Sequence, residues 1–135
     1  MILVDTSAWI EFLRGTESAV CREVEQLLGS AMAVTDPVAM EVLAGARDDK
    51  HLHHLRGLLG RAEMLRTDSV DYPAAAVLYR QCRQQGEALR RLLDCLIAAT
   101  AIRHGVPVLH CDEDFSALAR HTALKIHQPT TPETA

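Results

Sequence analysis

Residues 2–7 read Ile-Leu-Val-Asp-Thr-Ser, and this stretch decides the fold. A short run of branched aliphatic residues is typical of a strand buried on both faces, and the polar residues after it favour the start of a helix. The pattern recurs at residues 32–37, where Met-Ala-Val-Thr precedes Asp-Pro, a pair that commonly opens a helix. Apolar strands that alternate with helices predict a parallel sheet covered on both faces.

The rest of the chain continues this alternation. Apolar spacing, capping residues and glycines predict helices from residue 6 or 7 and over 17–29, 36–45, 49–60, 73–86, 91–104 and 114–120. Short apolar runs predict further strands at 64–67, 106–110 and 124–127. We therefore predict an α/β fold: one three-layer domain over residues 1–128, with a parallel sheet of about five strands flanked by helices. The Pro- and Thr-rich residues 129–135 are expected to form a flexible tail.

Composition limits the classes of function. The chain has 135 residues and a net charge of −4, which argues against a generally basic nucleic-acid coat. No apolar stretch approaches the roughly 18 residues of a membrane span, and the first residues lack the positive region of a secretory signal. The four cysteines have no paired spacing and indicate free thiols. We expect a cytoplasmic protein without membrane association.

One stretch is basic within this acidic chain. Arg80, Arg83, Arg90 and Arg91 occur close together, with Glu87 as the single acid among them. The planar guanidinium group suits bidentate contacts with phosphates. The stretch therefore indicates a place where a polyanionic substrate could be held.

Two acids follow predicted strands directly. Asp5 comes after the first strand, and Asp112 comes shortly after the strand predicted at 106–110. Ligands of open α/β sheets bind at the carboxyl ends of the strands. Each acid, and Asp114 beside Asp112, is also explained by capping of the helix that follows it.

Two further acids lie among apolar residues. Asp94 is flanked by Leu93 and Cys95, and Glu41 by Met40 and Val42. Asp94 could instead be an acid favoured by the dipole of its helix or a partner of a preceding arginine, and Glu41 a surface residue. If these carboxylates converge with those at the strand ends, they repel one another unless a cation neutralises them. Oxygen ligands select Mg²⁺ or Mn²⁺, which activate water for attack on phosphodiesters.

Four blocks of sequence resemble PIN-domain proteins, especially the VapC toxins of bacterial toxin–antitoxin pairs. They are the opening residues 1–9, Glu41-Val-Leu-Ala-Gly45, residues 94–101 and His110-Cys-Asp112-Glu-Asp114-Phe115, in the order and spacing of that family. The resemblance implies a PIN-like domain and a Mg²⁺-dependent endoribonuclease, with Mn²⁺ as a substitute. It also implies a homodimer inhibited by a VapB-type antitoxin.

The resemblance assigns roles position by position. It implies catalytic roles for Asp5, Glu41, Asp94 and Asp112, with the metal held by the three aspartates and Asp114 as an accessory acid. Thr6 and Ser7 are expected to bond within the site, and the four arginines at 80, 83, 90 and 91 to place the RNA. Cys111 and the pair Leu92-Leu93 depart from the family pattern at positions expected to influence substrate preference.

Two alternatives remain open on the sequence. In the first, the acids only cap helices and the protein is a non-catalytic, antitoxin-binding or regulatory module. In the second, the same acids serve a metal-dependent phosphatase that acts on small substrates. Titration with Mn²⁺ separates the first alternative from a nuclease. If the carboxylates converge, the ion relieves their repulsion and raises the melting temperature; if they only cap helices, it does not.

Overall fold

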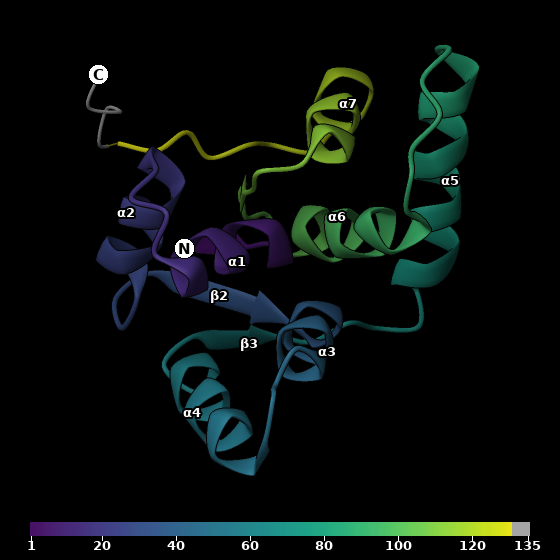
Figure 1. The fold of residues 1–135 in the computed structure, drawn as a ribbon. Coiled ribbons are helices and arrows are strands. Elements are labelled where there is room, and N and C mark those ends of the chain that lie inside the picture. The colour runs from purple at the N-terminus through teal and green to yellow at the C-terminus, as the bar shows by residue number, and fades with distance from the viewer. Residues whose placement is uncertain (131–135) are drawn as a thin grey trace.

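The computed structural model describes residues 1–130 and contains four strands and seven helices within them (Figure 1). The strands are β1 (Ile2–Val4), β2 (Met32–Thr35), β3 (Glu63–Leu65) and β4 (Val108–Leu109). The helices are α1 (Thr6–Arg14), α2 (Ala19–Leu27), α3 (Asp36–Ala44), α4 (Asp49–Leu59), α5 (Asp71–Gln84), α6 (Leu92–His104) and α7 (Glu113–His121). The predicted α/β class and the alternation of elements are confirmed.

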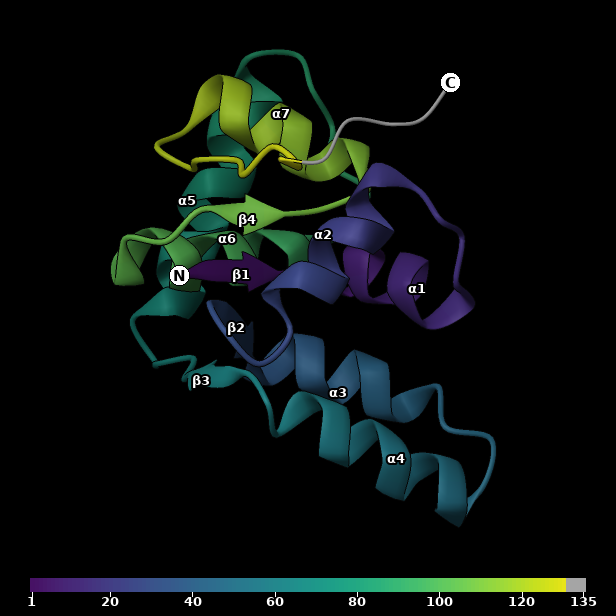
Figure 2. The same ribbon diagram turned by 90° about the vertical axis from the view of Figure 1, so that its left-hand side faces the viewer.

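The four strands form one parallel sheet in the order β3-β2-β1-β4. The strand β1 is central, because Leu3 pairs with Ala33 on one side and with Val108 on the other. Figure 2 shows β1 and β4 side by side and pointing the same way. The carboxyl ends of these two strands therefore lie next to each other, as expected.

The fifth strand predicted at 124–127 is reduced to an isolated bridge between Ile126 and Val108. The amide of Val108 donates to the carbonyl of Lys125 at 3.0 Å, and that of His127 donates to the carbonyl of Val108 at 2.9 Å. Since β4 is only two residues long, it offers little backbone for a longer partner. The described sheet thus has four strands, a minor difference from the expected number.

The core is aliphatic, as the composition indicates. Leu3, Val4 and Val34 from the strands are at most 1% exposed, and Trp9 and Phe115 are the largest fully buried side chains. Helix α5 packs against α6, and α1 packs against α2, while α3 contacts both α1 and α6. Helix α6 is therefore held next to α3, with Asp94 of its first turn buried.

The segment after α7 returns to the N-terminal part of the chain. The buried carboxylate of Glu23 on α2 lies 2.5 Å from Nε2 of His127 and accepts from the amide of Thr130 at 3.2 Å and from its hydroxyl at 2.8 Å. These contacts hold the chain up to residue 130. Of the tail predicted at 129–135, residues 131–135 lie outside the described residues.

Within residues 1–130, no helix combines the length and the apolar character needed to cross a membrane.

Candidate active site at the carboxyl ends of β1 and β4

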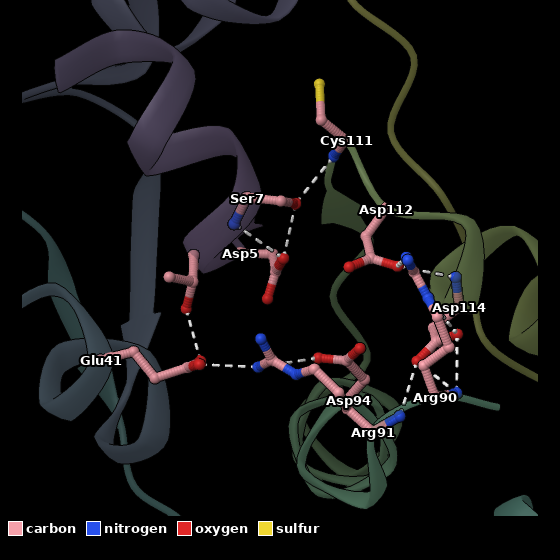
Figure 3. A network of polar contacts seen from close by, with 10 residues as sticks. Asp5, Ser7, Glu41, Arg90, Arg91, Asp94, Cys111, Asp112 and Asp114 are labelled. Carbon is pink, nitrogen blue, oxygen red and sulfur yellow. Dashed lines mark hydrogen bonds and ion pairs between the residues drawn. The ribbon is translucent and has the colours of Figure 1, made fainter. Parts of the chain in front are cut away.

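The site is built where β1 and β4 end. The amide of Asp5 donates to the carbonyl of Leu109 at 3.0 Å, which fixes the end of one strand against the other. Asp112 follows three residues after Leu109, and Figure 3 shows Asp5, Asp94 and Asp112 facing a common centre. Chain segments that are far apart in sequence thus meet at one edge of the sheet.

Asp5 both caps a helix and faces the site. Its Oδ2 accepts from the amide of Ser7 at 3.0 Å and from the Ser7 hydroxyl at 2.7 Å, which starts α1. Its Oδ1 is buried and has no hydrogen-bond partner within residues 1–130. Burial raises the pKa of Asp5, against the effect of the Ser7 hydrogen bonds, and the charge of Glu41 raises it further. Asp5 therefore caps α1 with Oδ2 and leaves Oδ1 free of hydrogen bonds within the described residues.

Ser7 joins the two strand ends. Its Oγ accepts from the amide of Cys111 at 2.8 Å while it donates to Asp5. A single hydroxyl thereby links the start of α1 to the loop after β4, which orients the Asp5 carboxylate. The Cys111 side chain points away from the acids (Figure 3).

Asp94 is the acid that the local structure does not explain. It lies in the first turn of α6, is 2% exposed, and caps nothing, since the N-cap of α6 is Arg91. Its Oδ1 lies 3.4 Å from Nη2 of Arg91, and its Oδ2 is buried without a partner in the described chain. Burial raises the pKa of Asp94 to about 8, the charge of Asp5 adds to the effect, and Arg91 opposes it.

Asp112 and Asp114 are fixed by backbone contacts. Asp112 caps α7, and its Oδ1 accepts from the amide of Asp114 at 2.9 Å and from Nη2 of Arg90 at 3.0 Å. The buried Asp114 accepts from the amide of Arg90 at 3.1 Å and from that of Arg91 at 3.0 Å. Asp94, Asp112 and Asp114 each offer an oxygen within 4.8 Å of the others. Asp114 thus lies close to the other acids and also anchors the segment before α6.

Glu41 on α3 lies on the opposite side of Asp5 from Asp112 (Figure 3). Its Oε1 accepts from the hydroxyl of Thr6 at 2.7 Å, and its Oε2 lies 2.6 Å from Nη2 of Arg91. It is therefore held by residues of α1 and of the segment before α6 rather than extended into solvent.

The structure separates the four arginines expected to bind RNA. Arg90 and Arg91 contact the acids, with side chains 69% and 44% exposed. Arg80 and Arg83 are exposed on α5, where the Arg83 guanidinium lies 5.7 Å from the ring centroid of Tyr79. Within residues 1–130, neither of these two joins the polar network of Figure 3.

Three relationships in the site have no signal in the sequence. They are the Thr6–Glu41 hydrogen bond, the ion pair between Arg91 and Glu41, and the bonds from backbone amides to Asp114. Each joins residues whose neighbourhood depends on helix packing. That the acids cluster was predictable from the positions of the strand ends, whereas the hydrogen bonds and ion pair that hold them in place were not.

The residues fit a hard divalent cation. Asp5 and Asp94 each carry a buried oxygen without a hydrogen-bond partner within the described part of the chain, and Asp112 is close to Asp94. Buried carboxylates are costly unless they are paired or bind a metal. An oxygen-only donor set of this kind suits Mg²⁺ or Mn²⁺ better than softer metals.

A groove runs from the site between α1, α3 and α4. Its volume is about 320 Å³, and Thr6 and Glu41 line it together with Ile10, Leu13, Arg14, Val42, Gly45, Arg47, His51 and Leu55. Apolar side chains and two arginines therefore lie directly beside the acidic site.

Comparisons with known proteins identify the family and agree with the fold. The family model described as the PIN domain matches residues 2–121. VapC ribonuclease Mb1587 of Mycobacterium bovis and Ribonuclease VapC11 of Mycobacterium tuberculosis are each 46% identical over 129 residues, which cover 93% of this chain and 96% of the relative. The structure of DNA-bound VapBC from Salmonella typhimurium is similar in fold, with a TM-score of 0.74 and 21% identity over 93% of this chain and 96% of that one.

Proposed function

The chain belongs to the PIN-domain family, among relatives of the VapC ribonucleases, and from this premise we propose that it is a metal-dependent endoribonuclease toxin. In this proposal it hydrolyses RNA phosphodiester bonds, leaving a 5′-phosphate and a 3′-hydroxyl, and a VapB-type antitoxin inhibits it. It works in the cytoplasm, where RNA substrates are found.

The buried, unpartnered oxygens of Asp5 and Asp94 carry the proposal. Two carboxylates held this close in a dry site destabilise the fold unless a cation neutralises them or one of them is protonated. We propose Mg²⁺ as the ion, held by Asp5, Asp94 and Asp112 with Asp114 as an accessory acid, and Mn²⁺ as a substitute. Such an ion supplies a Lewis acid and activates water.

The protein's own residues orient these ligands. Ser7 fixes one oxygen of Asp5, so that the other is left for the site. Thr6 fixes Glu41 in the same way, and the capping bond to Asp114 fixes Asp112. A carboxylate set that is held in advance loses little entropy when it binds a cation and a substrate.

The arginines beside the acids supply contacts for the RNA backbone. Arg90 and Arg91 lie at the edge of the acidic site with exposed side chains, and Arg80 and Arg83 extend a basic surface along α5. Their guanidinium groups suit phosphate oxygens. We propose that the first pair holds the phosphates nearest the scissile bond and the second pair holds more distant ones.

Asp94 distinguishes this function from a non-catalytic module. Asp5 and Asp112 do cap helices, so those two acids alone are compatible with a structural role. Asp94 caps no helix and is nevertheless buried beside other acids. The helix dipole and Arg91 favour an acid in this position, but burial and the charge of Asp5 disfavour its ionised form. A bound cation would offset that cost, which favours the nuclease.

We propose that the groove between α1, α3 and α4 receives the antitoxin. Two of its apolar side chains, Ile10 and Leu13, are each 39% exposed, and Arg14 and Arg47 could pair with acidic residues of a partner. A peptide bound there would reach Glu41 at the edge of the acidic site.

We also propose a homodimer formed through the face of α5 and α6. An apolar hollow of about 240 Å³ lies there, lined by Tyr72, Ala75, Ala76, Leu92, Leu93 and Leu96. Tyr72 and Leu92 are 60% and 58% exposed, and apolar residues this exposed and clustered favour association.

The proposal is tested by incubating antitoxin-free protein with total RNA in Mg²⁺ or in EDTA, beside the Asp5→Asn variant. Metal-dependent cleavage that the variant lacks is expected, with ends that carry a 5′-phosphate. Cleavage that is equal in EDTA would contradict the metal-dependent mechanism. Activity on p-nitrophenyl phosphate with intact RNA would instead favour the phosphatase.

A further inference from the structure

Arg91 places a positive charge inside the acidic site. Its Nη2 lies 2.6 Å from Oε2 of Glu41 and 3.4 Å from Oδ1 of Asp94, so one guanidinium bridges acids of α3 and α6 (Figure 3). Burial alone would lower the pKa of Arg91, but the charges of Asp94, Glu41 and Asp5 raise it. The side chain is therefore a cation that responds to three carboxylates of the site.

The backbone of Arg91 is held independently of its side chain. Its amide donates to Oδ2 of Asp114 at 3.0 Å, and the preceding amide of Arg90 donates to the same carboxylate. The side chain of Arg91 is 44% exposed. Because the anchor is in the backbone, the guanidinium can turn toward solvent without disrupting the start of α6.

The guanidinium neutralises the site only in part. Oδ1 of Asp5 and Oδ2 of Asp94 remain buried without a hydrogen-bond partner in the described chain, although Arg91 is next to them. A flat guanidinium donates from fixed directions, whereas a small ion accepts oxygens from any direction within its coordination sphere. A divalent cation can therefore bind the oxygens that Arg91 leaves unpaired.

We propose that Arg91 is a built-in counter-ion that holds Glu41 and Asp94 while no metal is bound and releases Asp94 when a divalent cation binds. Arg91 lies against Oδ1 of Asp94, while the cation would bind Oδ2 of the same carboxylate. Two like charges on one carboxylate repel each other, so the cation weakens the Arg91 contact. The released guanidinium remains at the edge of the site, where it can bind a phosphate. This inference rests on the proposed metal-dependent function.

The test is calorimetric titration of Mn²⁺ into the full-length wild type and into Arg91→Gln, without RNA. Arg91→Gln is expected to bind Mn²⁺ roughly tenfold more tightly, because the competing charge is gone. The matched control is Arg56→Gln, which removes the same charge from an exposed position on α4. Its affinity is expected to stay within about twofold of wild type, since distant surface charges are screened.

The outcomes separate this inference from the proposed function. Mn²⁺ affinity that is equal or weaker in Arg91→Gln, with normal binding by the wild type, overturns the counter-ion role and leaves metal dependence intact. Absence of Mn²⁺ binding in both folded proteins overturns the metal-dependent function, and the counter-ion role with it.

A second measurement follows the wild type, with Arg91→Lys needed only for assignment, in case Arg91→Gln does not fold. The side-chain ¹⁵N resonances of Arg91, assigned by comparison with Arg91→Lys, are followed while Mg²⁺ is added. They are expected to shift and to show increased mobility as Asp94 is released. Resonances that stay unchanged at saturating Mg²⁺ would refute displacement of the guanidinium.

Discussion

The hydroxyl of Thr6 donates a hydrogen bond of 2.7 Å to Oε1 of Glu41, across 35 residues of sequence. It ties the first residue of α1 to α3 and holds Glu41 beside Asp5. Thr6, which follows Asp5 in the sequence, therefore positions Glu41 beside Asp5.

Removal of this hydroxyl tests whether the position of Glu41 matters. Thr6→Val is expected to lower the rate of RNA cleavage about tenfold, because a hydrogen bond to a charged group contributes about 1.5 kcal/mol. Thr6→Ser keeps the donor and is the matched control. Equal rates for the valine and serine variants would show that this bond does not support activity.

Asp94→Asn is expected to abolish RNA cleavage while the protein stays folded. The substitution keeps the shape of the side chain and removes a charge that the site needs for its cation. Metal-free Asp94→Asn should also melt above the metal-free wild type, because a buried carboxylate with one unpartnered oxygen has been removed. Cleavage assays and thermal unfolding in EDTA measure the two effects, and full activity would reject Asp94 as a metal ligand.

The metal-free protein is expected to lose stability as the pH rises from about 4 to about 8. The pKa of Asp94 increases from 3.8 to about 8 on folding, so in this window the folded state binds more protons than the unfolded state. Stability then falls with rising pH, and the raised pKa of Asp5 acts in the same direction.

Urea unfolding in EDTA at several pH values measures this trend. Asp94→Asn should show a flatter dependence, since its side chain does not titrate. Saturating Mn²⁺ should reverse the trend in the wild type, because the cation binds the deprotonated acids. A wild type that becomes steadily more stable up to pH 8 in EDTA would contradict the burial of this charge.

Asp114→Ala is expected to destabilise the protein by about 2 kcal/mol, because it leaves the backbone amides of Arg90 and Arg91 without their acceptor. Asp112→Ala, the matched comparison, should cost about 1 kcal/mol through loss of its helix cap. Denaturant unfolding ranks the two. The reverse ranking would mean that Asp114 does not anchor the start of α6.

Leu92→Glu is expected to convert a dimer into a monomer with little loss of thermal stability. Leu92 is 58% exposed on the apolar face of α5 and α6, so a charge there is tolerated in the monomer but costly in an interface. Light scattering after size-exclusion chromatography gives the mass. A variant that remains dimeric would place the interface elsewhere.

The sequence by itself determined the order of the elements and the location of the site. Apolar runs, caps and helical spacing are local properties, so β1, β2 and the helices fall close to their predicted positions. Asp5 and Asp112 were recognisable because they follow strands, and Asp94 because its neighbours are apolar. The predicted strand at 124–127 is longer than the single bridge that forms there. Its length depends on how many residues of β4 are free to pair with it, and β4 has only two residues.

Only the tertiary structure decided how the site is supported. The packing of α3 and α6 at the end of the sheet puts the Arg91 guanidinium between Glu41 and Asp94, and it leaves Arg80 and Arg83 outside that network. The turn before α6 makes Asp114 an acceptor for backbone amides. Apart from the local Arg91–Asp94 pair, these contacts join residues more than 20 positions apart, so their existence depends on strand order and helix packing rather than on local preference.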